Sequence, residues 1–102
     1  MEIKNKVIEY IDERVELDHD DYYGYEDIRK KEVELLKLDL CSTISLLDQL
    51  DANHYLYIRE DFDDLSAYFK SSDFIECMKR NAIRTGVDCA VDIELAIIAL
   101  NA

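Results

Sequence analysis

The first hydrophobic residues of the chain recur with the period of an α-helix. Apolar side chains follow one another at spacings of four, one, three and four, so a helix from about residue 2 to residue 17 has one apolar face and charged residues on its other faces. The apolar positions are Ile3, Val7, Ile8, Ile11 and Val15. The following run, residues 18–25, breaks this period and contains Gly24, which predicts a loop.

A second and longer apolar stripe runs from about Glu26 or Asp27 to Leu50. Acidic side chains at its start suit a helix N-terminus, where the helix dipole is positive. The apolar positions are Ile28, Val33, Leu36, Leu40, Ile44, Leu47 and Leu50. About 25 residues at about 1.5 Å each would span nearly 40 Å. We therefore expect a kink near Ser42 and Thr43, or a break into two helices.

The middle of the chain predicts a further helix rather than a sheet. Tyr55–Ile58 is the one stretch with clear strand propensity, but no second β-rich run is present to pair with it. We therefore assign Tyr55–Ile58 to the start of a helix. Phe62, Leu65 and Phe69 then form a helical stripe that ends near Lys70.

Two helices are predicted at the end of the chain. Ser72 and Asp73, with Glu76 three residues after Asp73, indicate a helix start, and Gly86 can take the left-handed conformation that ends a helix. The last helix is expected to begin with Asp88 as its N-cap. This helix is apolar on nearly every side, which predicts a position at the centre of the bundle. Its apolar positions are Val91, Ile93, Leu95, Ile97, Ile98 and Leu100.

These patterns predict an all-α fold: one helical domain over residues 1–102, built as a compact bundle of five or six helices with mostly antiparallel neighbours. The chain has no proline and two glycines, so it lacks the residues that a fold with many tight turns needs. Its 49% hydrophobic content is too high for a disordered acidic tail. The three cysteines are an odd number without paired spacing, and we expect them to be reduced and packed as small apolar residues.

Net charge narrows the classes of partner. The chain has 24 acidic and 12 basic residues, a formal net charge of −12. This disfavours direct binding to nucleic acid, because that affinity comes from lysine and arginine at the phosphates. It favours a basic protein as partner. No stretch approaches the roughly 20 apolar residues of a membrane span. We therefore expect no membrane insertion and a cytoplasmic location.

The acidic charge is concentrated in two clusters. Residues 1–27 hold ten acids and three bases, a local net charge of −7, and a second cluster surrounds Phe62. Tyrosines accompany the first cluster, and tyrosine is enriched at protein interfaces, where carboxylates can pair with a partner's arginines. The alternative is a solvated acidic loop whose tyrosines fold back on the bundle. The candidate partner-binding residues are Asp18, Asp20, Asp21, Tyr22, Tyr23, Tyr25 and Glu26, with Glu60, Asp61, Asp63 and Asp64 as the second patch.

No sequence pattern indicates catalysis. His19, Asp20 and Asp21 are adjacent, which is not the spacing of metal ligands, and the chain has no EF-hand pattern. His54 stands apart from the other candidate catalytic residues and is expected in a loop or at a helix end. Glycine-rich phosphate loops are absent. We therefore expect no enzyme activity, no bound metal and no cofactor.

About a hundred residues, strong acidity, a helical pattern and an acidic Tyr-Tyr segment together make the chain resemble the immunity proteins of bacterial nuclease toxins, including those of colicins and of contact-dependent growth inhibition systems. In the colicin family an aspartate precedes a Tyr-Tyr pair on a short helix, and a proline follows. Here Asp20 and Asp21 precede Tyr22 and Tyr23, Gly24 follows, and the segment comes after the first helix. The resemblance therefore implies the chemistry of the contact and not its docking geometry.

The resemblance implies a protein that neutralises a cognate toxin, either by plugging its active site or by binding beside it. Two other readings of the sequence remain. One is a helical adaptor or oligomerisation module that meets a partner helix through an exposed apolar stripe. The other is an inhibitor that mimics nucleic acid by placing carboxylates where phosphates would sit.

Overall fold

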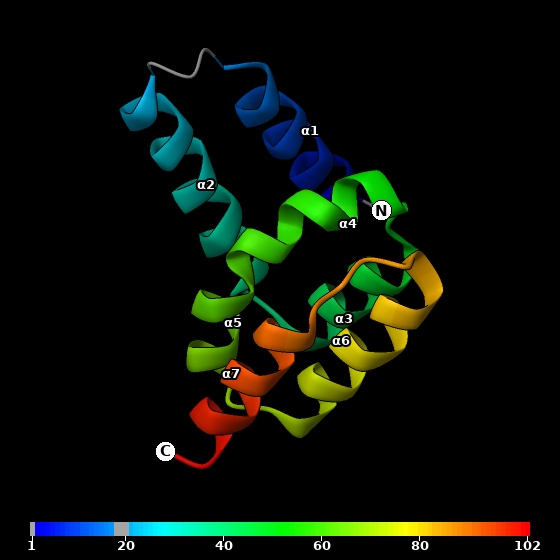
Figure 1. Ribbon diagram of the computed structural model, residues 1–102. Helices are drawn as coiled ribbons and strands as arrows, with labels where there is room; N and C mark the ends of the chain where they lie inside the picture. Colours follow the sequence, from blue (N-terminus) through cyan, green and yellow to red (C-terminus); the bar gives the residue numbers. More distant parts are fainter. Residues whose placement is uncertain (1, 18–20) are drawn as a thin grey trace.

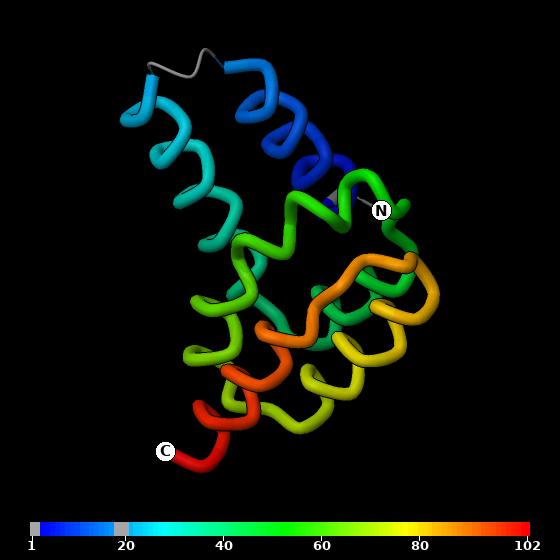
Figure 2. The backbone as a smooth tube through the Cα atoms, viewed as in Figure 1, coloured from blue at the N-terminus to red at the C-terminus, as the bar shows by residue number. Residues whose placement is uncertain are grey.

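The computed structural model describes residues 2–17 and 21–102, and within them the chain forms helices and no strand (Figure 1). The α-helices are α1 (Glu2–Glu16), α2 (Tyr22–Leu36), α3 (Leu40–Gln49), α4 (Ala52–Ile58), α5 (Phe62–Phe69), α6 (Ser72–Thr85) and α7 (Ala90–Leu100), with a 3₁₀ turn at Arg59–Asp61. The 3₁₀ turn joins α4 to α5 without a break, as the tube in Figure 2 shows. Within the described residues this gives six separate helical segments, which confirms the predicted all-α bundle.

The helices pack mainly in pairs. α1 and α2 lie side by side and antiparallel, α3 packs on α6, and α7 packs on α5 and α6 (Figure 1). The segment from α4 to α5 connects these pairs, because α4 contacts α1 while α5 contacts α2, α6 and α7. The end of α1 and the start of α2 form one extremity of the molecule, and the C-terminus lies at the opposite extremity (Figure 1).

The core contains a chain of aromatic rings. Tyr55, Phe62 and Phe74 are fully buried and meet edge to face, with ring centroids 5.6 and 6.0 Å apart. Edge-to-face pairs contribute about 0.5–1.5 kcal/mol beyond the burial of their area. The other large apolar side chains that are fully buried are Ile11, Leu36, Leu46, Leu47, Leu50, Ile58, Leu65 and Met78. The segment from α4 to α5 therefore supplies much of the centre of the bundle.

The start of α2 differs from the prediction. Tyr22 begins the helix, so Tyr22–Tyr25, which we predicted to be loop, form its first turn. The carboxylate of Asp21 caps this turn by accepting a hydrogen bond from the Gly24 N–H at 2.9 Å. A Cβ atom at position 24 would lie 2.6 Å from a carboxylate oxygen of Asp21, so glycine leaves room for the cap. The glycine is thus part of a helix start and does not mark a loop.

The long stripe from residue 26 to residue 50 does break into two helices, but the break lies at residues 37–39 and not at Ser42 and Thr43. Asp39 caps α3 by accepting hydrogen bonds from the Cys41 N–H and from the Ser42 hydroxyl. The Thr43 hydroxyl donates to the carbonyl of Leu36 at 2.6 Å, in the last turn of α2. Ser42 and Thr43 therefore stabilise the corner from inside α3 instead of bending a continuous helix.

Several predicted elements are confirmed. Tyr55–Ile58 is helical as predicted, although it forms the end of α4, which begins at Ala52, and not the start of a helix. α5 ends before Lys70, and α6 ends at Thr85 before Gly86, whose φ of 76° is the left-handed conformation. α7 begins at Ala90, two residues after the predicted cap, although the carboxylate of Asp88 still accepts from the Ala90 N–H at 3.0 Å.

The predicted position of the last helix is wrong. α7 lies at the edge of the bundle, and Val91, Leu95, Ile97 and Ile98 are exposed, whereas Ala96 is the one residue of α7 that is fully buried. An all-round apolar helix can be buried only if neighbours surround it. α7 packs on α5 and α6, and the centre is already filled from the segment that joins α4 to α5.

Two other expectations concern cysteine and the membrane. All three cysteines are free, but Cys41 is exposed, and so only Cys77 and Cys89 pack as buried apolar residues.

In residues 2–17 and 21–102, none of the helices has the length and apolar content needed to cross a membrane.

His54 joins α4 to α1 through two carboxylates. Its Nδ1 lies 2.7 Å from Asp51, the N-cap of α4, and its Nε2 lies 2.7 Å from Asp12 of α1. Partial burial alone would lower the pKa of His54, but the hydrogen bonds to Asp51 and Asp12 outweigh burial and raise it. The contact therefore stabilises the fold fully below the pKa of unfolded histidine, about 6.5, and the stabilisation is lost as the pH rises through the higher folded value.

We predict that His54→Gln lowers the free energy of unfolding by about 1 kcal/mol at pH 5.5 and by less at pH 8.5, since glutamine cannot provide the charge. Urea unfolding of both proteins at several pH values measures the difference. A difference that does not change with pH would contradict the role of the imidazolium.

Candidate protein-binding surface

A buried arginine connects the two acidic patches predicted from the sequence. Arg14 of α1 binds Glu32 of α2 with two hydrogen bonds, from Nε at 3.1 Å and from Nη2 at 3.2 Å. Its Nη1 donates to Glu60 at 2.6 Å and to the Tyr25 hydroxyl at 2.8 Å, and its Nη2 also donates to the Tyr57 carbonyl at 2.8 Å. One side chain therefore ties α1, α2, α4 and the 3₁₀ turn together.

The charges of this cluster are compensated inside the protein. Burial opposes the charge of Arg14, but the hydrogen bonds and charge of Glu32 outweigh it, and the pKa of Arg14 lies above its ordinary value. Burial and the hydrogen bond to Glu60 raise the pKa of Tyr25 to about 12. The Tyr25 hydroxyl therefore stays protonated and donates to Glu60 while it accepts from Arg14.

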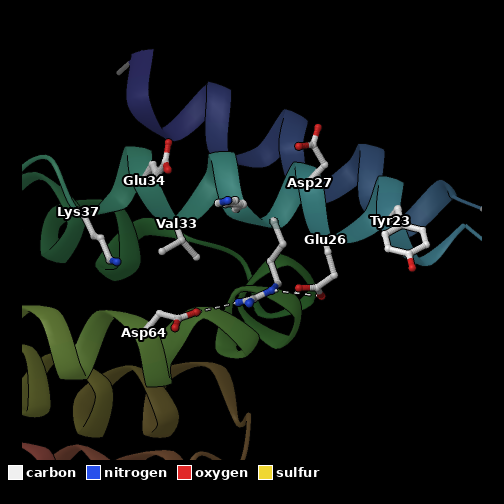
Figure 3. Close-up of a pocket in the computed structure, with 9 residues that line it drawn as sticks. Tyr23, Glu26, Asp27, Val33, Glu34, Lys37 and Asp64 are labelled. Carbon is white, nitrogen blue, oxygen red and sulfur yellow. Dashed lines mark hydrogen bonds and ion pairs between the residues drawn. The ribbon is translucent and has the colours of Figure 1, made fainter.

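A second arginine links α2 to α5. Nη1 of Arg29 lies 3.1 Å from Asp64 and 3.3 Å from Asp61, and its Nε lies 3.6 Å from Glu26. Figure 3 shows Asp64 and Glu26 on the two sides of this bridge, joined through it by dashed lines. The carboxylates of Glu26 and Asp64, which we predicted to meet a partner, are therefore already paired within the chain.

Asp61 is a correction to the predicted site. Its side chain is fully buried, so it cannot contact a partner. Its Oδ1 accepts from Arg29, but its Oδ2 is buried with no hydrogen-bond partner among the described residues as long as the group is ionised. Burial, followed by hydrogen bonding with Glu32, raises the pKa of Asp61 far above its ordinary value. The protonated form of Asp61 is therefore favoured, and in that form its carboxyl can donate a hydrogen bond to Glu32.

The start of α2 is the exposed part of the first patch. Tyr22 is 65% exposed and Tyr23 is 86% exposed, and their rings meet edge to face with centroids 5.8 Å apart. Asp21 beside them is also exposed. The predicted contact residues Asp18 and Asp20 lie outside the described residues. Tyr22 and Tyr23 are therefore exposed, whereas Tyr25, the third tyrosine of the segment, folds back onto Arg14 and Glu60.

The second patch is divided by the structure. Glu60 and Asp64 join the first patch through the two arginines. Asp63 is exposed and lines a different hollow, beside Arg59 and the start of α7. Consecutive residues of a helix point about 100° apart, which is why Asp63 and Asp64 serve different faces.

A hollow between α2 and α5 lies next to the exposed tyrosines. Tyr23 stands at one end and Lys37 at the other (Figure 3). It is lined by Tyr23, Glu26, Asp27, Arg29, Lys30, Val33, Glu34, Lys37 and Asp64. Because acidic and basic side chains alternate around it, this hollow suits a polar protein surface better than a single anion or cation. Within the part of the chain that the structure describes, no three His, Cys, Asp or Glu side chains are grouped to hold a metal ion.

The sequence interpretation missed the two arginines and Glu32, although two of these three residues carried a signal. Arg14 follows Ile11 by three residues and Glu32 precedes Leu36 by four, so each occupies a position where the helical period requires an apolar side chain. Opposite charges on the apolar stripes of two neighbouring helices indicate a buried ion pair.

Comparison of the chain with protein-family models, with curated proteins and with solved structures gave no match. The class of protein is therefore judged from the surface itself. Its features are an exposed tyrosine pair, an exposed carboxylate beside it and a rigid base of internally paired charges.

We predict that Arg14→Met lowers the free energy of unfolding by about 3–5 kcal/mol, because it leaves the buried Glu32 without its cation. The double variant Arg14→Met/Glu32→Met should be more stable than the single variant, since it removes the unpaired charge as well. Urea unfolding of the three proteins tests this, and equal stabilities of the single and double variants would show that Arg14 and Glu32 do not act as a pair.

We predict that Asp61→Asn changes how stability depends on pH. A carboxyl group with a raised pKa in the folded state stabilises the fold fully below the unfolded value of about 4, and this contribution falls as the pH rises above it. Asparagine cannot ionise, so the variant should gain stability relative to the parent protein between pH 5 and pH 8. The exposed Asp63→Asn is the matched control and should leave the pH slope nearly unchanged. Parallel slopes for the parent protein and Asp61→Asn would rule out a raised pKa of Asp61.

Proposed function

We propose that the protein binds a basic partner protein through the exposed start of α2 and that it is an immunity protein, which neutralises a cognate bacterial toxin nuclease in the cytoplasm of the producing cell. The single observation that carries the proposal is the adjacent pair Tyr22 and Tyr23, both largely exposed beside the carboxylate of Asp21. Tyrosine is enriched among the few residues that contribute most of the binding free energy at protein interfaces. Paired on the surface, they have no role in the core.

The base under the tyrosines supports this proposal. Arg14 fixes Tyr25 to Glu60 and Asp21 caps the same turn, so the backbone that carries Tyr22 and Tyr23 is held at both ends. A preorganised contact loses less conformational entropy on binding. The paired charges beneath the tyrosines thus favour tight binding even though they do not touch the partner.

The shape and charge of this region favour a nuclease as the partner. The end of α1 and the start of α2 lie at one extremity of the molecule (Figure 1), where they can enter a groove. The net charge of −12 accelerates encounter with a groove that is basic because it holds phosphates. Specificity for one toxin would come from the tyrosines, since charge alone does not distinguish between basic proteins.

The first experiment is to express the tagged chain in its native host, capture it at low and at physiological salt, and identify the proteins that co-purify. One basic partner in stoichiometric amount, retained at physiological salt, is the expected result. Many basic proteins that are lost with salt would instead support a general nucleic-acid mimic, because screened charge contacts are weak. Recovery of no partner would contradict the proposal.

We predict that Tyr22→Ala/Tyr23→Ala weakens binding to the captured partner at least 100-fold, since hot-spot aromatics contribute about 2 kcal/mol or more each. Tyr68→Ala is the matched control, because Tyr68 is also an exposed tyrosine, at 58%, but lies on α5. Isothermal titration calorimetry with the purified partner measures both affinities. If the control weakened binding as much as the double variant, the contact would not be at the start of α2.

A further inference from the structure

The exposed face of α7 forms a regular apolar stripe. Val91 is 66% exposed, Leu95 44% and Ile98 59%, and they follow one another at spacings of four and three residues. These spacings place the three side chains on one side of the helix over about 10 Å, which is the pattern of a helix that packs against another helix. Ile97 beside the stripe is exposed as well. The opposite side of α7 is already packed on α5 and α6.

An acidic hollow adjoins the first residue of this stripe. It is lined by Arg59, Glu60, Asp63, Asp88, Val91 and Asp92, so four carboxylates surround one guanidinium and one apolar side chain. Arg59 is engaged within the hollow, by a hydrogen bond of 2.8 Å to the Asp88 carbonyl and by an ion pair of 4.0 Å with Asp92. In the described part of the chain, Asp63 makes no ion pair. Glu60 is already paired with Arg14, so the carboxylates of Asp63, Asp88 and Asp92 remain against the one guanidinium of Arg59, and the hollow has an excess of negative charge.

The ionisation of Asp92 reflects this crowding. Burial raises the pKa of Asp92, Asp63 and Asp88 raise it further, and Arg59 only partly compensates. A positive group placed in the hollow would relieve this repulsion. The hollow thus favours a cationic side chain of a partner, and the adjoining stripe favours several apolar side chains of the same partner.

We propose that the stripe and the hollow together bind an amphipathic basic helix of a partner protein. The apolar face of that helix lies along Val91, Leu95 and Ile98, and a lysine or arginine within one turn of its end enters the hollow. This surface does not include Tyr22 or Tyr23, because it lies on α7, the residues just before it, the 3₁₀ turn and the start of α5. It does not depend on the function proposed above.

Charge distinguishes this partner from a second copy of the chain. α7 contains Asp92 and Glu94 and no lysine or arginine. A two-fold contact centred on Leu95 would bring the two Glu94 side chains and the two acidic hollows toward one another, which costs free energy. The same carboxylates disfavour the anionic surface of a membrane.

The test uses three synthetic peptides of equal length with blocked ends. The first has leucines at spacings of three and four and lysine and arginine at one end, the second has the same residues in shuffled order, and the third has glutamate in place of the basic residues. Fluorescence anisotropy should show that the first binds at least tenfold more tightly than the others. Shifts of amide resonances in the ¹⁵N-labelled protein should concentrate in α7 and at Arg59 and Asp63.

Variants of the protein separate this surface from general attraction between opposite charges. Ile98→Asp should weaken binding of the basic amphipathic peptide at least tenfold. Ile83→Asp is the matched control, because Ile83 is an exposed isoleucine on α6 and receives the same charge, and it should bind as the parent protein does. Asp63→Asn/Asp92→Asn should also weaken binding and should reduce its dependence on salt.

Three results would overturn the proposal. One is equal binding of the shuffled peptide, which would mean that charge alone acts. Another is a loss of binding in Tyr22→Ala/Tyr23→Ala, which would place the peptide on the start of α2. The third is a dimer in sedimentation equilibrium that Ile98→Asp dissociates, which would assign the face to a second copy. Unchanged binding by the tyrosine double variant would support the α7 surface whatever the outcome for the toxin partner.

Discussion

The ion pair between Arg14 and Glu32 is the constraint on which the arrangement of this protein depends. It is buried between α1 and α2, where a charge is tolerated only if its partner and hydrogen bonds are complete. The remaining donors of Arg14 satisfy this requirement by binding Tyr25, Glu60 and the Tyr57 carbonyl. Because these groups come from separate helices, the hydrogen bonds of the one Arg14 side chain fix how α1, α2 and the segment from α4 to α5 lie against each other.

The same network decides which carboxylates a partner could contact. Glu60 is held by Arg14, Asp64 is held by Arg29, and Asp61 is fully buried with a raised pKa. An acidic sequence therefore does not give a uniformly acidic surface. Among the described residues, few exposed side chains next to the ion pairs of Arg14 and Arg29 are free to contact a partner. The most distinctive of them are Tyr22 and Tyr23 at the start of α2.

Much of the fold could be predicted because local rules acted alone. The end of α6 at Gly86 follows from a backbone conformation that glycine favours, and the 3.6-residue period located the stripes. The buried charges were missed because charged residues were assumed to be exposed, whatever their position in the helical period. Arg14, Glu32 and Asp61 all stand on apolar stripes, Asp61 being three residues after Ile58 and four before Leu65. The edge position of α7 could not be predicted, since a period shows which faces are apolar and not how many neighbours cover them.

The internal charge pairs and the exposed contact residues lie in different places, and this affects how the sequence can diverge in evolution. Tyr22 and Tyr23 at the start of α2, and Val91, Leu95 and Ile98 on α7, contribute little to the core and lie on different elements. Substitutions at either place can therefore accumulate without unfolding the chain and without disturbing the other place. A lineage of such proteins could acquire a new partner on one helix and keep the old one on another, with the buried arginine unchanged throughout.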